Sequence, residues 1–218
     1  MAAYAGELLR GDEAGAAIVT ERHAGHFLTV AQQYTLEAYN AGRWASYDVD
    51  WPDVVAGADW ALAQLEADGR EAAEWVDRYV RALTQVGGRR DRRLGLRWFQ
   101  AGIQATRMLG DRAGEAATLN NMAIIYFQRG EPERAEELLH RALQLARDVG
   151  AVAVEAAHLH NLASVLHSAL GRTDEAIDLA TRSISILKQY NLPQDAYGSS
   201  LAQHEALLGQ MQALRGEL

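Results

Sequence analysis

Two asparagines recur at the same place in a repeated stretch of sequence. Residues 114–123, GEAATLNNMA, align with residues 154–163, VEAAHLHNLA, at an offset of forty residues, and this alignment superposes Asn121 on Asn161. A side-chain amide carries both hydrogen-bond donors and an acceptor, so it can pair with the backbone of an extended peptide whatever the sequence of that peptide. The two asparagines are therefore candidates for binding a polypeptide.

The residues around these asparagines supply the rest of the candidate site. We expect them to lie along the same helix surface as the asparagines and to set the side-chain preference of a bound peptide. They are Asn120, Ile124, Phe127 and Gln128 in the first copy, and His160, Ser164, His167 and Ser168 in the second. The alternative is that each asparagine hydrogen-bonds to the end of a neighbouring helix and has a purely structural role.

The sequence lacks the patterns of the common catalytic and metal sites. It has no cysteine, no Gly-x-Ser-x-Gly elbow and no His-Glu-x-x-His pair, and its only lysine, Lys188, is not part of a P-loop. His160 and His167 share a helix face, whereas His158 points to a different one. Two histidines without a third ligand favour a solvated or groove-lining pair over a metal site. We expect neither enzymatic activity nor a cofactor.

The apolar residues around the asparagines follow the spacing of an α-helix. In both copies they lie at relative positions 0, 3, 4 and 7, which places them on one face. A second helix with an equally regular face is expected after each copy, and a degenerate third copy lies forty residues upstream. The faces of the first helices are Leu119, Met122, Ala123 and Tyr126, then Leu159, Leu162, Ala163 and Leu166, and in the degenerate copy Tyr79, Ala82, Leu83 and Val86. Those of the second helices are Ala135, Leu138, Leu139, Ala142 and Leu145, then Ala176, Leu179, Ala180, Ser183 and Ile186, and in the degenerate copy Gly95, Trp98, Phe99, Gly102 and Ala105.

The predicted turns contain residues that end one helix and start the next. In residues 129–133, RGEPE, Gly130 can adopt the left-handed conformation that ends a helix, and Pro132 suits the first position of the following one. In the second copy Gly171 takes the place of Gly130, and Thr173 is expected to be the N-cap. Each copy is therefore predicted to be a helical hairpin.

This pattern resembles the tetratricopeptide repeat (TPR). The resemblance rests on Ala123 and Tyr126 in the first helix, Gly130 in the turn, and Ala135 and Ala142 in the second helix. The period of forty exceeds the usual length of about thirty-four and is similar to the longer kinesin-light-chain-type repeats. The resemblance implies an all-α helical-hairpin solenoid, a TPR superhelix of about eight or nine helices. It also implies that the asparagines line a concave groove, where the equivalent asparagine of the resembling families clamps a peptide backbone.

The repeats divide the chain into a central array and two caps. Caps are expected because a terminal repeat otherwise exposes an apolar face. The predicted parts are an N-terminal helical capping segment, 1–70, three TPR-like repeats over 71–192 (71–110, which is degenerate, 111–150 and 151–192), and a C-terminal capping helix, 193–218.

The N-terminal part resembles the junction between winged helix and TPR repeats in STAND-type signalling ATPases. The resemblance rests on Arg22-His23-Ala24, Phe27-Leu28 and Trp60-Ala61-Leu62. It implies an alternative function, as the ligand- or partner-sensing regulatory segment of such an ATPase or of a transcriptional regulator, either excised from a longer protein or acting in trans. A third hypothesis is a self-associating structural module, a homo-oligomer, since an open-ended solenoid can stack through its terminal faces.

Charge and composition restrict the partners. The chain has 218 residues, of which 49% are hydrophobic and 23% charged, as is usual for globular proteins. Its 21 basic and 29 acidic residues give a net charge of −8, which on average repels nucleic acid and anionic membranes. The longest uncharged run, 156–171, is sixteen residues and contains three histidines, so we expect no membrane span. The sequence therefore predicts a cytoplasmic, non-catalytic scaffold that binds a peptide or helix segment of another protein in the concave groove.

Overall fold

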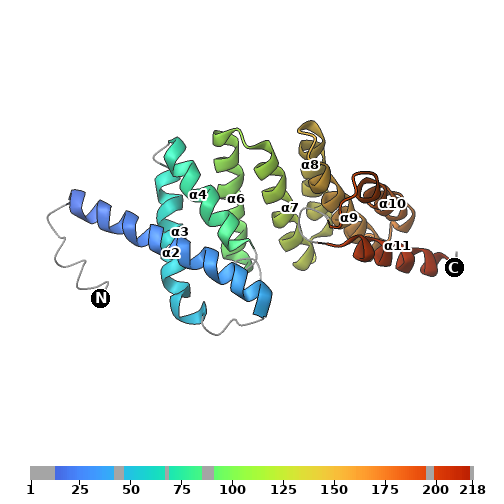
Figure 1. Cartoon of the computed structure of the whole chain (residues 1–218), viewed down its shortest axis with the longest axis horizontal. Helices are drawn as coiled ribbons and strands as arrows, with labels where there is room; N and C mark the ends of the chain where they lie inside the picture. The colour runs from blue at the N-terminus through green and yellow to red at the C-terminus, as the bar shows by residue number, and fades with distance from the viewer. Residues whose placement is uncertain (1–12, 42–46, 67–68, 85–90, 195–198, 217–218) are drawn as a thin grey trace. The chain divides into compact units, whose positions relative to one another are not determined.

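The computed structural model describes residues 13–41, 47–66, 69–84, 91–194 and 199–216. Within these ranges the chain forms nine helices and no strand, which confirms the predicted all-α class (Figure 1). None of the described helices is both long enough and apolar enough to cross a membrane. The helices are α2 (Glu13–Ala41), α3 (Tyr47–Glu66), α4 (Arg70–Leu83), α6 (Arg92–Leu109), α7 (Arg112–Gln128), α8 (Pro132–Asp148), α9 (Val152–Ser168), α10 (Thr173–Gln189) and α11 (Leu201–Arg215).

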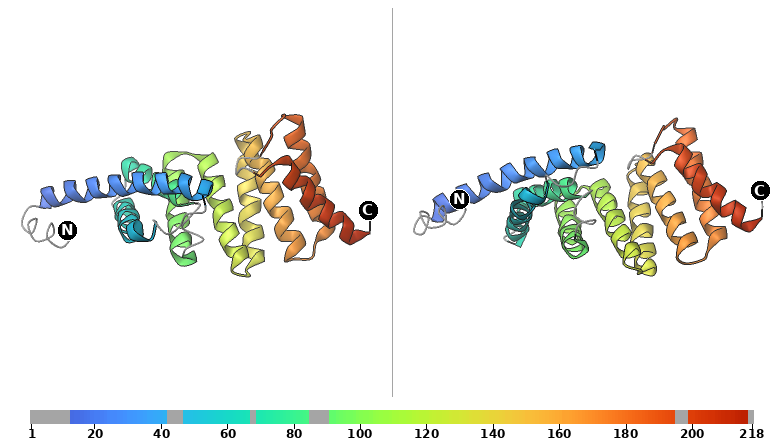
Figure 2. Two further views of the ribbon diagram at one scale, coloured as in Figure 1. Left: turned by 60° about the horizontal axis from the view of Figure 1, so that its bottom comes forward. Right: turned by 90° about the horizontal axis from the view of Figure 1, so that it is seen from below.

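The chain is divided into two compact units, Met1–Leu109 and Gly110–Leu218, which we call unit 1 and unit 2. In unit 2, α7 pairs with α8 and α9 pairs with α10 as helical hairpins. Helix α8 also packs on α9, and α11 packs on α10, so these five helices follow one another in space in chain order (Figure 2). The first helices of the two hairpins are therefore α7 and α9, and the second helices are α8 and α10.

The cores of the hairpins of unit 2 are built from the predicted helix faces. Small residues on these faces let the helices pack closely, and the side chains of larger neighbours fill the space between them. The alanines Ala123, Ala135, Ala142, Ala163 and Ala176 are all completely buried. Most of the predicted face residues are buried, but Tyr126, Leu145, Leu179 and Ile186 are only half-buried. The predicted faces therefore point inward, and part of each remains accessible at its edge.

Glycines in a left-handed conformation follow the C-terminal ends of α6, α7, α8 and α9. Gly110, Gly130, Gly150 and Gly171 have φ angles of 72°, 75°, 67° and 66°. A residue with a Cβ atom is strained in this region, whereas glycine is not. The predicted role of Gly130 is confirmed.

The helix starts are confirmed in one turn and differ in the other. Pro132 is the first residue of α8, as predicted. In the next turn the prediction for Thr173 was wrong: Thr173 is already the first residue of α10, and the N-cap position is held by Arg172. The Thr173 hydroxyl instead hydrogen-bonds to Nδ1 of His167 at 3.1 Å, so it does not cap a backbone amide.

We expect Gly130→Ala to lower the free energy of unfolding by about 1–2 kcal/mol, because alanine is strained at a positive φ angle. No atom lies within 4 Å of a Cβ built at Gly130, so backbone strain is the whole effect. Gly209 is a matched control, since it lies inside α11 in equally open space but without a positive φ angle. Gly209→Ala should stabilise by about 0.5–1 kcal/mol. Urea denaturation followed by circular dichroism measures both changes. If the free energy of unfolding changes in the same direction in the two variants, the strain at Gly130 is not the cause.

In unit 1, α4 and α6 are the helices of the predicted degenerate repeat. They pack on each other, and the predicted face residues of both helices are buried, apart from Val86, which lies outside the described residues. Helix α2 lies across α3 and α4 (Figures 1 and 2). The contact is fixed by Tyr79 of α4, whose hydroxyl donates a hydrogen bond of 2.5 Å to the carbonyl of Ala24 in α2. Burial raises the pKa of Tyr79 well above its usual value, so the hydroxyl keeps its proton and remains a donor.

The C-terminal helix α11 begins at Leu201, eight residues later than the predicted start at 193. Its N-terminus is set by a capping box. The Ser200 hydroxyl accepts a hydrogen bond from the backbone amide of Gln203, and the Gln203 side chain accepts one from the backbone amide of Ser200. These reciprocal bonds satisfy two amides that the helix itself leaves unpaired, and they place the helix start after Pro193 rather than at it.

Candidate functional site

Five of the ten predicted binding residues line one cavity in unit 2. The cavity has a volume of about 240 Å³ and lies between the two first helices, α7 and α9. We call it the α7–α9 cavity. It is lined by Ile124, Phe127 and Gln128 of α7, Leu139 of α8, and Asn161, Ser164 and Val165 of α9.

Helix geometry explains why these residues meet. On each of α7 and α9 the lining residues are three and four positions apart, so they project from one side of their helix. Leu139 and Val165 are buried and form an apolar base, while Gln128 is exposed and Ser164 is half-buried at the edge. No charged side chain lines the cavity. The site therefore offers apolar surface with neutral hydrogen-bonding groups at its rim.

Asn161 is held in place by Asn120 of the neighbouring first helix. Its Nδ2 donates a hydrogen bond of 2.8 Å to Oδ1 of Asn120. Asn120 itself is completely buried, and its own Nδ2 has no hydrogen-bond partner among the described residues. One N–H of Asn161 is thus used in a bond to another side chain, and its second N–H and its Oδ1 make no hydrogen bond to a described residue. The partner of Asn161 is another side chain, and not a helix end as in the structural alternative.

Asn121 and Ser168 are not among the residues that line the cavity. Asn121 is half-buried, and its side chain makes no hydrogen bond to any described residue. The hydroxyl of Ser168 donates to the backbone carbonyl of Ser164 within α9, at 2.5 Å. The structure therefore separates Asn121 from Asn161, although the forty-residue repeat makes them equivalent.

The two predicted histidines have partners outside the cavity. The ring of His160 stacks on the ring of His204 in α11, with centroids 4.1 Å apart and an interplanar angle of 27°. His167 bonds to Thr173 at the start of α10. Among the residues that the structure describes, no group of three His, Asp or Glu side chains could hold a metal ion.

Sequence reasoning missed two lining residues, Leu139 and Val165. Leu139 belongs to the predicted apolar face of the second helix, so its spacing could have placed it under the cavity. Val165 follows Ser164 and lies off the predicted 0, 3, 4, 7 face, so no periodic signal marked it.

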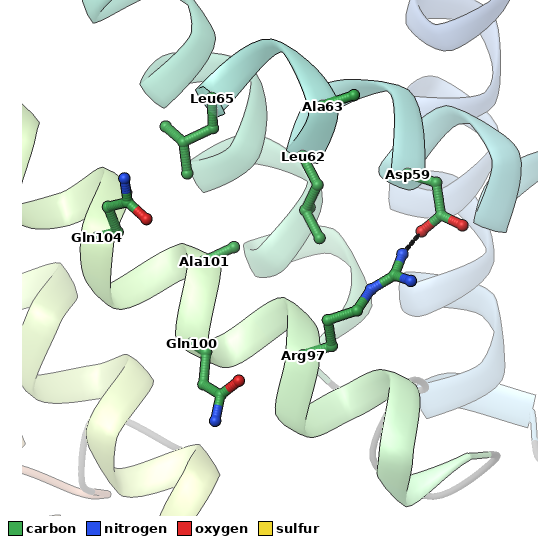
Figure 3. A pocket seen from close by; sticks show the side chains of 8 residues that line it. All are labelled: Asp59, Leu62, Ala63, Leu65, Arg97, Gln100, Ala101 and Gln104. Atoms are coloured by element: carbon green, nitrogen blue, oxygen red, sulfur yellow. Dashed lines mark hydrogen bonds and ion pairs between the residues drawn. The ribbon is translucent and has the colours of Figure 1, made fainter. Parts of the chain in front are cut away.

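A second and larger cavity, of about 590 Å³, lies between α3 and α6 in unit 1 (Figure 3). It contains none of the predicted binding residues. Arg97 of α6 forms an ion pair with Asp59 of α3 at one end of the cavity, and Gln104 lies at the opposite end. Since the two charged groups already neutralise each other, this cavity has no charge left for a ligand.

The comparisons with known proteins agree with the hairpin architecture. The tetratricopeptide repeat family matches residues 96–189. BtubC (BKLC) from P. vanneervenii is similar in structure, with a TM-score of 0.54 and 18% identity, over 91% of this chain and 85% of that chain. A Podosopora anserina protein of the kinesin light chain type, with nearly identical TPR-like repeats, gives a TM-score of 0.56 and 14% identity over 86% of this chain and 89% of its own. A single-substitution form of the same protein gives a TM-score of 0.57 and 15% identity over 86% of this chain and 88% of that chain.

At these identities the structural likeness shows the fold alone. The search of the curated proteins gave no significant match. Neither the family match nor the similar structures support the resemblance of the N-terminal part to STAND-type ATPases, whereas they do support the likeness to kinesin-light-chain-type repeats. The chain therefore has a TPR-type repeat fold, and residues 96–189 of it match the tetratricopeptide repeat family.

Proposed function

We propose that this protein is a non-catalytic scaffold that binds a peptide segment of another protein at the α7–α9 cavity. TPR-type folds typically mediate protein–protein interaction. The observation that carries the proposal is the cavity itself, because five residues predicted from the repeat pattern line it and one of them, Asn161, is oriented by the hydrogen bond that it donates to Asn120 of the neighbouring repeat.

The size and chemistry of the cavity indicate which part of a peptide enters it. At about 240 Å³ it is smaller than the roughly 300–1,000 Å³ of pockets that enclose a drug-sized ligand. It suits one side chain. The apolar base of Leu139 and Val165 favours an apolar side chain, and the lack of a charged lining residue disfavours an acidic or basic one, which would be desolvated without a partner.

The rim of the cavity supplies hydrogen bonds to the peptide backbone. The remaining amide groups of Asn161 can accept from a backbone N–H and donate to a backbone C=O, and Gln128 can do the same from α7. Asn120 is a positioning residue, because it is buried and fixes the rotamer of Asn161. An oriented amide loses less conformational freedom on binding than a mobile one, so the pair favours affinity.

The test begins with a random peptide library displayed on phage and selected against the full chain. Peptides that bind wild type should bind Asn161→Ala about 5- to 100-fold more weakly, which corresponds to about 1–3 kcal/mol for the lost hydrogen bonds. Isothermal titration calorimetry measures the change. Asn121→Ala is the matched control, since it removes the equivalent amide from a position that does not line the cavity, and its affinity should stay within about twofold of wild type. Equal affinities for wild type and Asn161→Ala would contradict the proposal.

A further inference from the structure

A cavity of about 330 Å³ in unit 1 has walls of a different chemistry. It is formed where α2, α3 and α4 meet, and it contains none of the residues of the proposed peptide site. Its lining includes Glu21 of α2, Trp60 and Gln64 of α3, and Glu71, Ala72 and Trp75 of α4. We call it the tryptophan pocket.

The two tryptophans form perpendicular aromatic walls. The centroids of Trp60 and Trp75 are 5.3 Å apart, with an interplanar angle of 85°, and both side chains are half-buried. The face of an indole ring carries negative potential and attracts cations more strongly than other aromatic rings do. Unit 1 already shows this attraction, because the guanidinium of Arg78 lies over the ring of Trp75, 5.0 Å from its centroid.

Two carboxylates line the pocket, one from α2 and one from α4. Glu21 and Glu71 are exposed, and neither makes a hydrogen bond or ion pair with a described residue. Other carboxylates of α4 are paired within the helix: Glu74 lies 3.2 Å from Arg70, and Asp77 lies 2.8 Å from Arg81. The pocket therefore has, beside its two indole rings, two carboxylates that form no ion pair with a described residue.

The dipole of helix α4 accounts for the position of only one of the two carboxylates. Glu71 lies in the first turn of α4, where a carboxylate is stabilised by the helix dipole without any ligand. That explanation does not apply to Glu21, which comes from the body of α2, and it does not account for the aromatic walls. Carboxylates and indole rings from three helices therefore line one cavity.

We propose that the tryptophan pocket binds a basic side chain, lysine or arginine, of a partner polypeptide. The cation contacts the indole rings of Trp60 and Trp75, and Glu21 and Glu71 supply the opposite charge. The occupant's charge follows from complementarity, because an acidic group is repelled by both carboxylates and by the net charge of −8. At about 330 Å³ the pocket has room for one lysine or arginine side chain.

The test uses the full chain and a blocked tripeptide, acetyl-Gly-Lys-Gly-amide, titrated at constant ionic strength. The readout is the indole N–H resonance of each tryptophan, assigned with single Trp→Phe variants. We expect saturable shifts of the Trp60 and Trp75 resonances with a dissociation constant in roughly the millimolar range. The resonance of Trp98, which is buried in the core, should not move. The same peptide with norleucine in place of lysine has the shape without the charge and should cause no saturable shift.

Charge-removing variants separate specific binding from general attraction. Glu21→Gln combined with Glu71→Gln should weaken the lysine peptide about fivefold or more. Glu74→Gln, which removes a carboxylate of α4 outside the pocket, should leave the affinity within about twofold. Because all three residues are exposed, the thermal midpoints of the variants should match wild type. The proposal is overturned if lysine and norleucine peptides behave alike, if the double variant binds as wild type does, or if tetramethylammonium binds and the lysine peptide does not.

Discussion

Gly57→Ala is expected to lower the free energy of unfolding by about 2–4 kcal/mol, since the new methyl group has no space in α3. A Cβ at this position overlaps the hydroxyl oxygen of Tyr79 and lies 3.0 Å from its Cζ. Tyr79 has no room to withdraw, because its side chain is 1% exposed and its hydroxyl is bonded to the carbonyl of Ala24. Either the ring moves and its hydrogen bond to Ala24 breaks, or α3 and α4 move apart. Urea denaturation followed by tryptophan fluorescence measures the loss.

A matched control for this substitution is Gly25→Ala in α2. There the added Cβ meets only Cη2 of Trp75, at an ordinary contact distance of 3.4 Å. The gain in helix propensity of about 0.5–1 kcal/mol should then leave this variant at least as stable as wild type. If Gly25→Ala and Gly57→Ala destabilise equally, the contact with Tyr79 is not the cause.

A second substitution tests the mechanism directly. Tyr79→Phe removes the oxygen atom that the new methyl group overlaps, at the expense of one hydrogen bond of about 0.5–1.5 kcal/mol. In the Gly57→Ala background this change should therefore be less harmful than in wild type, and should even be favourable. Strict additivity of the two free energies would mean that the two sites do not interact, contrary to the geometry.

The helical hairpins of unit 2 could be predicted from the sequence because each is determined locally. The period of the apolar faces, the left-handed glycine and Pro132 all act within one repeat. The glycine and Pro132 were found as predicted, and most of the predicted face residues are buried. The start of α11 depends on a different local signal, the reciprocal bonds between Ser200 and Gln203, which the expectation of a helix start at Pro193 ignored. The contact between Gly57 and Tyr79 joins helices that no periodicity relates, so no pattern in the sequence marked it.

The candidate site was predictable as a surface but not residue by residue. Adjacent residues on a helix point about 100° apart, so Asn120 and Asn121 have different surroundings: Asn120 is completely buried and Asn121 is half-buried. The forty-residue alignment makes Asn121 equivalent to Asn161, yet the side chain that meets Asn161 is that of Asn120. Which of two neighbouring asparagines is buried depends on how α7 and α9 are rotated against each other, and this rotation is set by the packing of the hairpins.

The same alignment shows that the contact between one first helix and the next uses different side chains at the C-terminal end of unit 2. His160 is the equivalent of Asn120, and each of them contacts the next helix on its side: Asn120 bonds to Asn161 of α9, and His160 stacks on His204 of α11. Helix α11 thus occupies the place of a further first helix. The contact there uses a stacked pair of rings in place of a pair of amides, and it is completed by a buried serine of α10.

That serine, Ser183, should be the most sensitive position at the C-terminal end of unit 2. Ser183 and His204 are both completely buried. The Ser183 hydroxyl donates to the carbonyl of Ala156 in α9 at 2.7 Å, and its oxygen lies 2.8 Å from Nδ1 of His204. A hydroxyl has a single hydrogen, so Nδ1 of His204 must carry the proton and donate to the serine oxygen. One hydroxyl therefore links α9, α10 and α11.

We expect Ser183→Ala to lower the free energy of unfolding by about 2–3 kcal/mol. The substitution removes two hydrogen bonds, and the buried Nδ1–H of His204 loses its serine acceptor. Ser185→Ala is the matched control: this exposed serine of the same helix bonds only to the carbonyl of Thr181, and its loss should change stability by less than about 0.5 kcal/mol. Urea denaturation with circular dichroism compares the two variants.

A His204→Leu substitution tests whether Ser183→Ala is destabilised because the Nδ1–H of His204 loses its serine acceptor. In that background the leucine removes the N–H that has lost its acceptor, so the double variant should be more stable than the sum of the single changes predicts, by about 1 kcal/mol or more. Hydrogen exchange should show the same order in the amides of α11, which open first when its anchor to α10 is lost. A double variant that is exactly additive, with α11 protected as in wild type, would mean that packing alone holds this helix and that the hydroxyl is incidental.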